Sequence, residues 1–149
     1  MFNGCESLKD NVDLLDNVNL SPYCYSHMFE NCMSLEKINN LSSMILRDGC
    51  YEYMYSGCNS LINLSNQQLL ASELVYKCYE GMFKDCLYLQ IAPTIYAKTL
   101  ADSCMNSMFY NCSRLKDINV FFTYWVEEYT NNWLSGVAKN GFFGKLNQL

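Results

Sequence analysis

The stretch CYEGMFKDCLYL, residues 78–89, contains the pattern that decides the fold. Its core, Met-(Phe/Tyr)-x-x-Cys-x-x-Leu, occurs five times, beginning at Met1, Met28, Met54, Met82 and Met108. The intervals between these methionines are 27, 26, 28 and 26 residues. A sequence that repeats at so constant a period predicts equivalent units stacked on one another.

Every cysteine of the chain belongs to this repeat. One column lies four residues after the methionine and the other four residues before it, so the unit is Cys-x-x-x-Met-(Phe/Tyr)-x-x-Cys-x-x-Leu. Side chains spaced by four residues share one face of a helix, so we expect a short helix with a sulfur-lined inner face in each repeat. The two columns are Cys5, Cys32, Cys58, Cys86 and Cys112, and Cys24, Cys50, Cys78 and Cys104.

The residues after each leucine predict a short strand. In Leu35-Glu36-Lys37-Ile38-Asn39 apolar side chains stand at the first and fourth positions, and the third, fourth and fifth repeats also have apolar residues there. A unit of 26–28 residues cannot bury its apolar face alone, whereas five stacked units form a continuous core. The sequence therefore predicts an α/β solenoid of five repeats over residues 1–120, each with a short helix and a short parallel strand.

The motif also carries a family resemblance. CYxxMFxxCxxL followed by a short strand resembles the BspA-like (Treponema pallidum-type) bacterial leucine-rich repeat. The resemblance implies a leucine-rich-repeat solenoid of short helix, loop and parallel strand, of the kind found on bacterial surfaces or in phage proteins, which binds other macromolecules. Residues 132–143, NWLSGVAKNGFF, are similar to the closing segment that often follows such repeats.

Residues 121–149 leave the period and contain both tryptophans, Trp125 and Trp133. The last unit of a solenoid exposes an apolar end that needs a cover, so we expect this aromatic segment to cap the same domain. A second interpretation makes the two tryptophans hot spots of a binding surface.

The cysteine spacing argues against metal binding and against disulfides within one repeat. Structural zinc sites use close pairs such as C-x2-C, whereas the spacing here is C-x7-C. Two cysteines eight residues apart on a helix lie about 12 Å apart, too far to bridge. We expect a ladder of small, buried, reduced thiols, with no metal and no cofactor.

No pattern in the chain points to catalysis. The sequence contains no GxGxxG, P-loop, GxSxG or HExxH motif. His27 is the only histidine, and no orienting group for a Cys-His pair is visible beside it. We therefore expect a protein that is not an enzyme.

Composition and charge limit the classes of partner that we expect for this chain. The 149 residues are 50% hydrophobic with a net charge of −5, which excludes a disordered chain and argues against general binding to nucleic acid or anionic membranes. No apolar run is long enough to span a bilayer. No signal peptide is recognisable, so we expect a cytoplasmic protein as the chain is given, or a surface protein if it is a fragment.

Two columns of side chains between the buried positions are candidates for partner binding, although plain solubility would also explain them. They are Asp10, Lys37, Asn63, Ile91 and Asp117, and Asn39, Ser65 and Asn119. Because these columns vary while the buried ones barely change, the pattern favours a protein-recognition module that uses its outward sheet face. The alternative is an intracellular inhibitor, for example a phage protein that blocks a bacterial defence enzyme. At the uncapped N-terminal end we expect either a homodimer, most simply a twofold one, or a longer parent protein from which this chain was cut.

Overall fold

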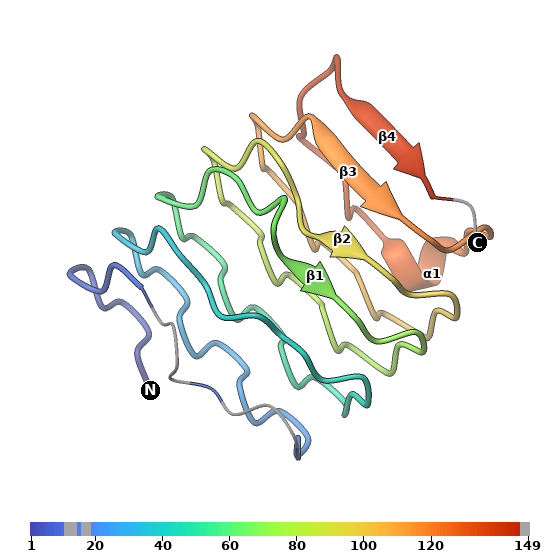
Figure 1. Ribbon diagram of the computed structural model, residues 1–149, viewed down its shortest axis with the longest axis horizontal. Coiled ribbons are helices and arrows are strands. Elements are labelled where there is room, and N and C mark those ends of the chain that lie inside the picture. Colours follow the sequence, from blue (N-terminus) through green and yellow to red (C-terminus); the bar gives the residue numbers. More distant parts are fainter. Residues whose placement is uncertain (11–14, 16–18, 147–149) are drawn as a thin grey trace.

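The structure is a computed structural model that describes residues 1–10, 15 and 19–146. Its strands form one parallel sheet in the order β1-β2-β3-β4 (Figure 1), which agrees with the α/β class expected from the sequence. The elements in chain order are β1 (Gln68–Leu69), β2 (Thr94–Ile95), β3 (Asp117–Val120), α1 (Glu127–Thr130) and β4 (Phe142–Lys145).

Equivalent repeat positions pair with one another. Strand β3 aligns with β4 from Asp117 opposite Phe142 to Val120 opposite Lys145. Isolated parallel bridges continue this pairing toward the N-terminus, joining Asp10 to Lys37, Asn63 to Ile91 and Ile91 to Asp117. Successive segments of chain therefore lie side by side across the molecule (Figure 1).

The predicted repeat helices were wrong. We call the stretches that carry Cys-x-x-x-Met-(Phe/Tyr)-x-x-Cys the turn segments, because they consist of consecutive turns. In the described part of the chain α1 is the only α-helix. Every fourth residue of a turn segment has a positive φ angle, which an α-helix does not tolerate. These residues are Tyr23, His27 and Asn31, then Gly49, Tyr53 and Gly57, then Lys77, Gly81 and Asp85, then Ser103, Ser107 and Asn111.

The turn segments divide their backbone N–H groups between two sets of acceptors. The N–H groups of Cys24, Ser26 and Met28 donate to carbonyls three residues earlier in the same segment, each at 3.2 Å. Those of Tyr25 and His27, which alternate with them, donate to carbonyls of the next repeat at 3.0 and 2.8 Å. The alternation satisfies the backbone without helix or regular strand, as a buried backbone requires.

The core is built from side chains stacked on their equivalents in the next repeat. Phe29 stacks on Tyr55, which stacks on Phe83, with ring centroids 5.7 Å apart in both pairs. A second stack joins Tyr51 to Tyr79 at 6.1 Å. Because the same kind of residue recurs at each stacked position, each repeat offers the next repeat the same kind of surface that the preceding repeat offers to it.

The C-terminal segment continues this pairing. The N–H groups of Ser107 and Phe109 donate to the carbonyls of Asn131 and Trp133, as in the earlier turn segments. Gly136, with φ of +82, occupies the position equivalent to Asn111. Residues 126–145 thus lie against the fifth repeat in the register that the repeats use among themselves.

The close approach of the Tyr53 ring to Gly81 provides a test of this stacking. Gly81 has φ of +57, and a Cβ atom added there would collide with the ring of Tyr53 in the preceding repeat. We expect Gly81→Ala to lower the free energy of unfolding by roughly 2 kcal/mol or more, because the left-handed backbone strain adds to the collision. Urea unfolding measures this loss.

A double variant separates the two causes. Tyr53→Ala removes the ring, so Gly81→Ala should cost only about 1 kcal/mol in that background. The control is Ser107→Ala, which changes a residue that is already non-glycine at φ of +54. Strictly additive losses for Tyr53→Ala and Gly81→Ala would contradict the contact.

Candidate functional site

The first column of predicted binding residues forms a row along the strand side. Bridges place Asp10 beside Lys37, and Asn63 and Asp117 on either side of Ile91. The side chains of Asp10, Lys37 and Asn63 are exposed, and those of Ile91 and Asp117 are half-buried. The row presents acidic, basic, amide and apolar groups in succession.

The second column does not all face outward. Ser65 is exposed and Asn119 is half-buried, but Asn39 is buried with 7% of its surface accessible. The Nδ2 group of Asn39 donates to the carbonyl of Leu15 at 3.4 Å, which turns its side chain inward. The expectation that Asn39 belongs to the outward surface was therefore wrong.

Seven of the nine cysteines are buried, and all nine are free thiols. In the column that follows the methionine, each buried thiol donates to a carbonyl of the preceding repeat. These pairs are Cys32 to Phe2 at 3.0 Å, Cys58 to Phe29 at 3.1 Å, Cys86 to Tyr55 at 3.2 Å and Cys112 to Phe83 at 3.0 Å.

Two thiols depart from the predicted buried ladder. Cys24 is exposed and Cys5 is only half-buried. Cys5 belongs to the first repeat and Cys24 to the second. The prediction that all nine thiols are buried was wrong for these two.

Burial also suppresses ionisation of the thiols. Loss of hydration raises the pKa of Cys58 and of Cys112 from 9.0 to about 12, and that of Cys104 to about 11. Because the thiolate is the reactive form, these cysteines are poor nucleophiles and poor metal ligands near neutral pH.

Thiol labelling tests this division. With a maleimide reagent near pH 7 and without denaturant, we expect Cys24 to react fastest, Cys5 more slowly and the seven buried thiols only after unfolding. Mass spectrometry of peptides identifies the labelled sites. Rapid native labelling of Cys58 or Cys86 would contradict the buried ladder, and Cys24→Ser should remove the fastest phase.

Alkaline pH tests the raised pKa values. Above pH 9 the unfolded chain releases thiol protons that the folded chain retains, so the free energy of unfolding falls as pH rises, with each thiol contributing at most about 1.4 kcal/mol per pH unit. Below that pH the contribution is fully present. The measurement is the urea midpoint at a series of pH values.

The control for the alkaline experiment replaces two thiols by valine. Val137 follows Gly136 as Cys112 follows Asn111, so the fold already accepts valine at an equivalent position. Cys58→Val with Cys112→Val should make the alkaline loss of stability shallower. An unchanged slope would assign the loss to other groups.

The remaining residues singled out in the sequence lie apart from the strand-side row. His27 stacks on Tyr53 with centroids 5.1 Å apart, and its Nδ1 atom lies 2.8 Å from the Glu30 carboxylate. Trp133 is buried and its ring lies 6.3 Å from that of Phe109, whereas Trp125 is 45% exposed. The Trp125 ring nevertheless lies 5.1 Å from the rings of Phe122 and Trp133. Both tryptophans therefore pack in one aromatic cluster of the C-terminal segment, with Trp125 on its exposed side.

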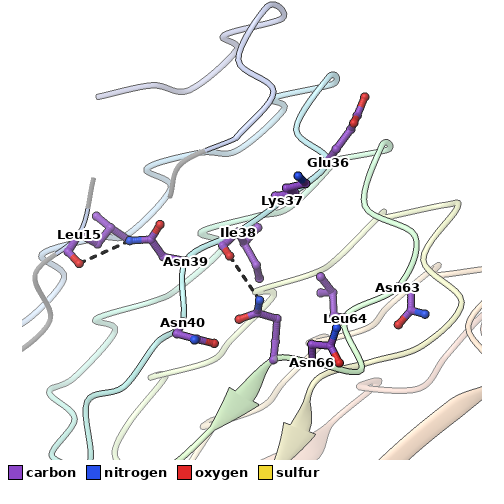
Figure 2. A pocket seen from close by; sticks show the side chains of 10 residues that line it. Leu15, Glu36, Lys37, Ile38, Asn39, Asn40, Asn63, Leu64 and Asn66 are labelled. Atoms are coloured by element: carbon purple, nitrogen blue, oxygen red, sulfur yellow. Dashed lines mark hydrogen bonds between the residues drawn. The ribbon is translucent and has the colours of Figure 1, made fainter. Parts of the chain in front are cut away.

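The structure brings together a group of amide residues that the sequence reasoning missed. A cavity of about 580 Å³ lies between the second and third repeats on the strand side, and Figure 2 shows the side chains that line it. The predicted site residues Lys37, Asn39 and Asn63 line it. So do Asn40, Asn66 and Gln67, none of which was predicted. The available signal in the sequence was the pair of runs Asn39-Asn40, at the end of one predicted strand, and Asn66-Gln67-Gln68, just after the next.

Comparison with known proteins gives no assignment. No protein-family model, no curated protein and no solved structure matches the chain. Within residues 1–10, 15 and 19–146, no helix combines the length and apolar character that crossing a membrane requires. The same residues contain no group of three or more His, Cys, Asp or Glu side chains that could hold a metal ion.

Proposed function

We propose that this protein is a non-catalytic protein-interaction module, a leucine-rich-repeat solenoid of the BspA-like kind, that binds a partner protein through its outward strand face. The observation that carries the proposal is the row of bridged residues at one repeat position, which includes Lys37, Asn63, Ile91 and Asp117. Side chains in this row differ from repeat to repeat, whereas the stacked rings and thiols behind them recur.

The buried columns and the strand-side row are under different physical constraints. A change at a buried column alters packing with both neighbouring repeats, so it affects the whole stack. A change in the row alters only the solvated face and costs little stability. This division lets the row diversify for a partner while the fold is retained, which is the property that a recognition surface needs.

The direction of the backbone hydrogen bonds between repeats constrains the expected homodimer at the N-terminal edge. Phe2 and Gly4 donate their N–H groups to the carbonyls of Met28 and Glu30, so each turn segment directs acceptors toward the preceding repeat. A twofold contact between two first turn segments would set acceptors against acceptors. The direction of these bonds therefore disfavours the twofold form of the expected homodimer.

Charge reversal in the row tests the proposed function. We expect Lys37→Glu combined with Asp117→Lys to leave the urea midpoint nearly unchanged and to weaken partner binding at least tenfold, because both charges lie on the proposed interface. The partner is first captured from cells of the source organism and identified by mass spectrometry, and its affinity is then measured by calorimetry.

The matched control is Lys98→Glu combined with Glu128→Lys, which makes the same charge changes at exposed residues outside the row. It should bind like the parent protein. Equal losses in the two double variants would assign binding to overall charge, and full binding by the row variant would overturn the proposed face.

A further inference from the structure

The pairing of equivalent residues is interrupted at one place on the strand side. Lys37 bridges back to Asp10, and Asn63 bridges forward to Ile91. No backbone hydrogen bond joins residues 36–38 to residues 62–64, all of which the structure describes. The cavity of about 580 Å³ lies at this interruption (Figure 2).

The interruption leaves main-chain groups facing the cavity. In a parallel bridge one residue bonds through its own N–H and C=O, whereas the N–H and C=O of the opposite residue point away from that partner. The bonds that serve the Asn63–Ile91 bridge use the carbonyl of Ile62 and the N–H of Leu64. The N–H and C=O of Asn63 are therefore directed toward the second repeat, where they have no backbone partner in the described part of the chain.

Side-chain amides line the same space. The Nε2 group of Gln67 spans the interruption and donates to the carbonyl of Ile38 at 3.4 Å. Its Oε1 atom is buried and accepts no hydrogen bond from the described residues. A second hollow of about 280 Å³ shares Asn40 and Asn66 with the first and extends the lining to Gln68. We call the two hollows together the amide groove.

The lining selects the chemistry of the ligand. Amide side chains both donate and accept, as peptide groups do. The described residues that line the two hollows include no aromatic ring on which a sugar or a nucleobase could stack. Among the described residues of the lining, Glu36 and Lys37 are the only charged ones, so these residues offer no basic cluster for phosphate.

We propose that the amide groove binds an extended peptide segment of a partner protein, recognised chiefly through its main chain at the interrupted pairing between the second and third repeats. The inference rests on the proposed function and gives it a ligand class. Asn63 supplies main-chain groups, Asn66 and Gln67 supply side-chain amides, and the buried side chains of Ile38 and Leu64 form an apolar floor.

The dimensions indicate the length of peptide. The groove follows residues 36–42 on one side and 63–70 on the other. At about 3.3 Å per extended residue, seven residues span roughly 23 Å. Alternate side chains of such a peptide point toward Ile38 and Leu64, so we expect small apolar residues at every second position.

The experiment selects heptapeptides from a random display library on the immobilised protein and measures their affinities by fluorescence polarisation. Asn66→Ala and Gln67→Ala should each weaken binding by roughly threefold to tenfold, as the loss of a hydrogen bond predicts. The matched control is Asn140→Ala, an exposed asparagine outside the groove. A circular-dichroism melt confirms that each variant is folded.

Backbone methylation tests main-chain recognition directly. N-methylation of the selected peptide at each position in turn should abolish binding at alternate positions and have small effects between them, because alternate N–H groups of an extended strand face the same side. A uniform or absent effect would overturn main-chain recognition. Failure to select any heptapeptide, or selection that Asn66→Ala and Gln67→Ala leave intact, would overturn the groove as a peptide site.

Competition with the captured partner distinguishes the two proposals. Displacement of the partner by the selected heptapeptide supports both. A partner that is lost with Lys37→Glu and Asp117→Lys, but is retained by Asn66→Ala and Gln67→Ala and not displaced by peptide, overturns the groove and leaves the strand-face function standing. A partner insensitive to all four substitutions overturns both.

Discussion

The alternation of backbone N–H groups in the turn segments is the interaction on which the rest of the structure depends. One N–H closes a turn within the segment and the next donates to the following repeat, as the pair Met28 and Phe29 illustrates with bonds to Tyr25 and Met54. This division holds consecutive repeats at hydrogen-bonding distance without a continuous strand. The small, buried cysteines fit this close spacing, and their thiols add a weak bond to the preceding repeat.

The same alternation explains why the interior is nearly uniform. Each aromatic ring stacks on its equivalent, so a residue that fits one repeat must fit both neighbours. Glycine enters where a large side chain of the preceding repeat lies across the backbone, as Tyr53 does over Gly81. The strand-side row is free of this constraint, and its side chains differ from repeat to repeat.

The groove and the row are parts of one surface. Lys37 and Asn63 belong to both, so a partner protein could place a folded surface against the row and an extended segment in the groove. The row and the groove have the same structural origin. The repeats are held together on the turn side by a dense set of bonds, which leaves the strand side free to lose some of its pairing.

The sequence by itself determined the period, the buried columns and the parallel pairing of equivalent positions. The motif at Met28 and its copies recurs at nearly constant spacing, and residues such as Lys37 and Asn63 bridge at the repeat position assigned to the strand. Tertiary structure alone decided between helix and turns. A spacing of four between Cys78, Met82 and Cys86 fits one face of a helix and equally fits turns of four residues, and bonds to the next repeat select the turns. The inward side chain of Asn39 and the interrupted pairing beside Asn63 were likewise beyond the sequence, because each depends on contacts between residues more than 20 positions apart.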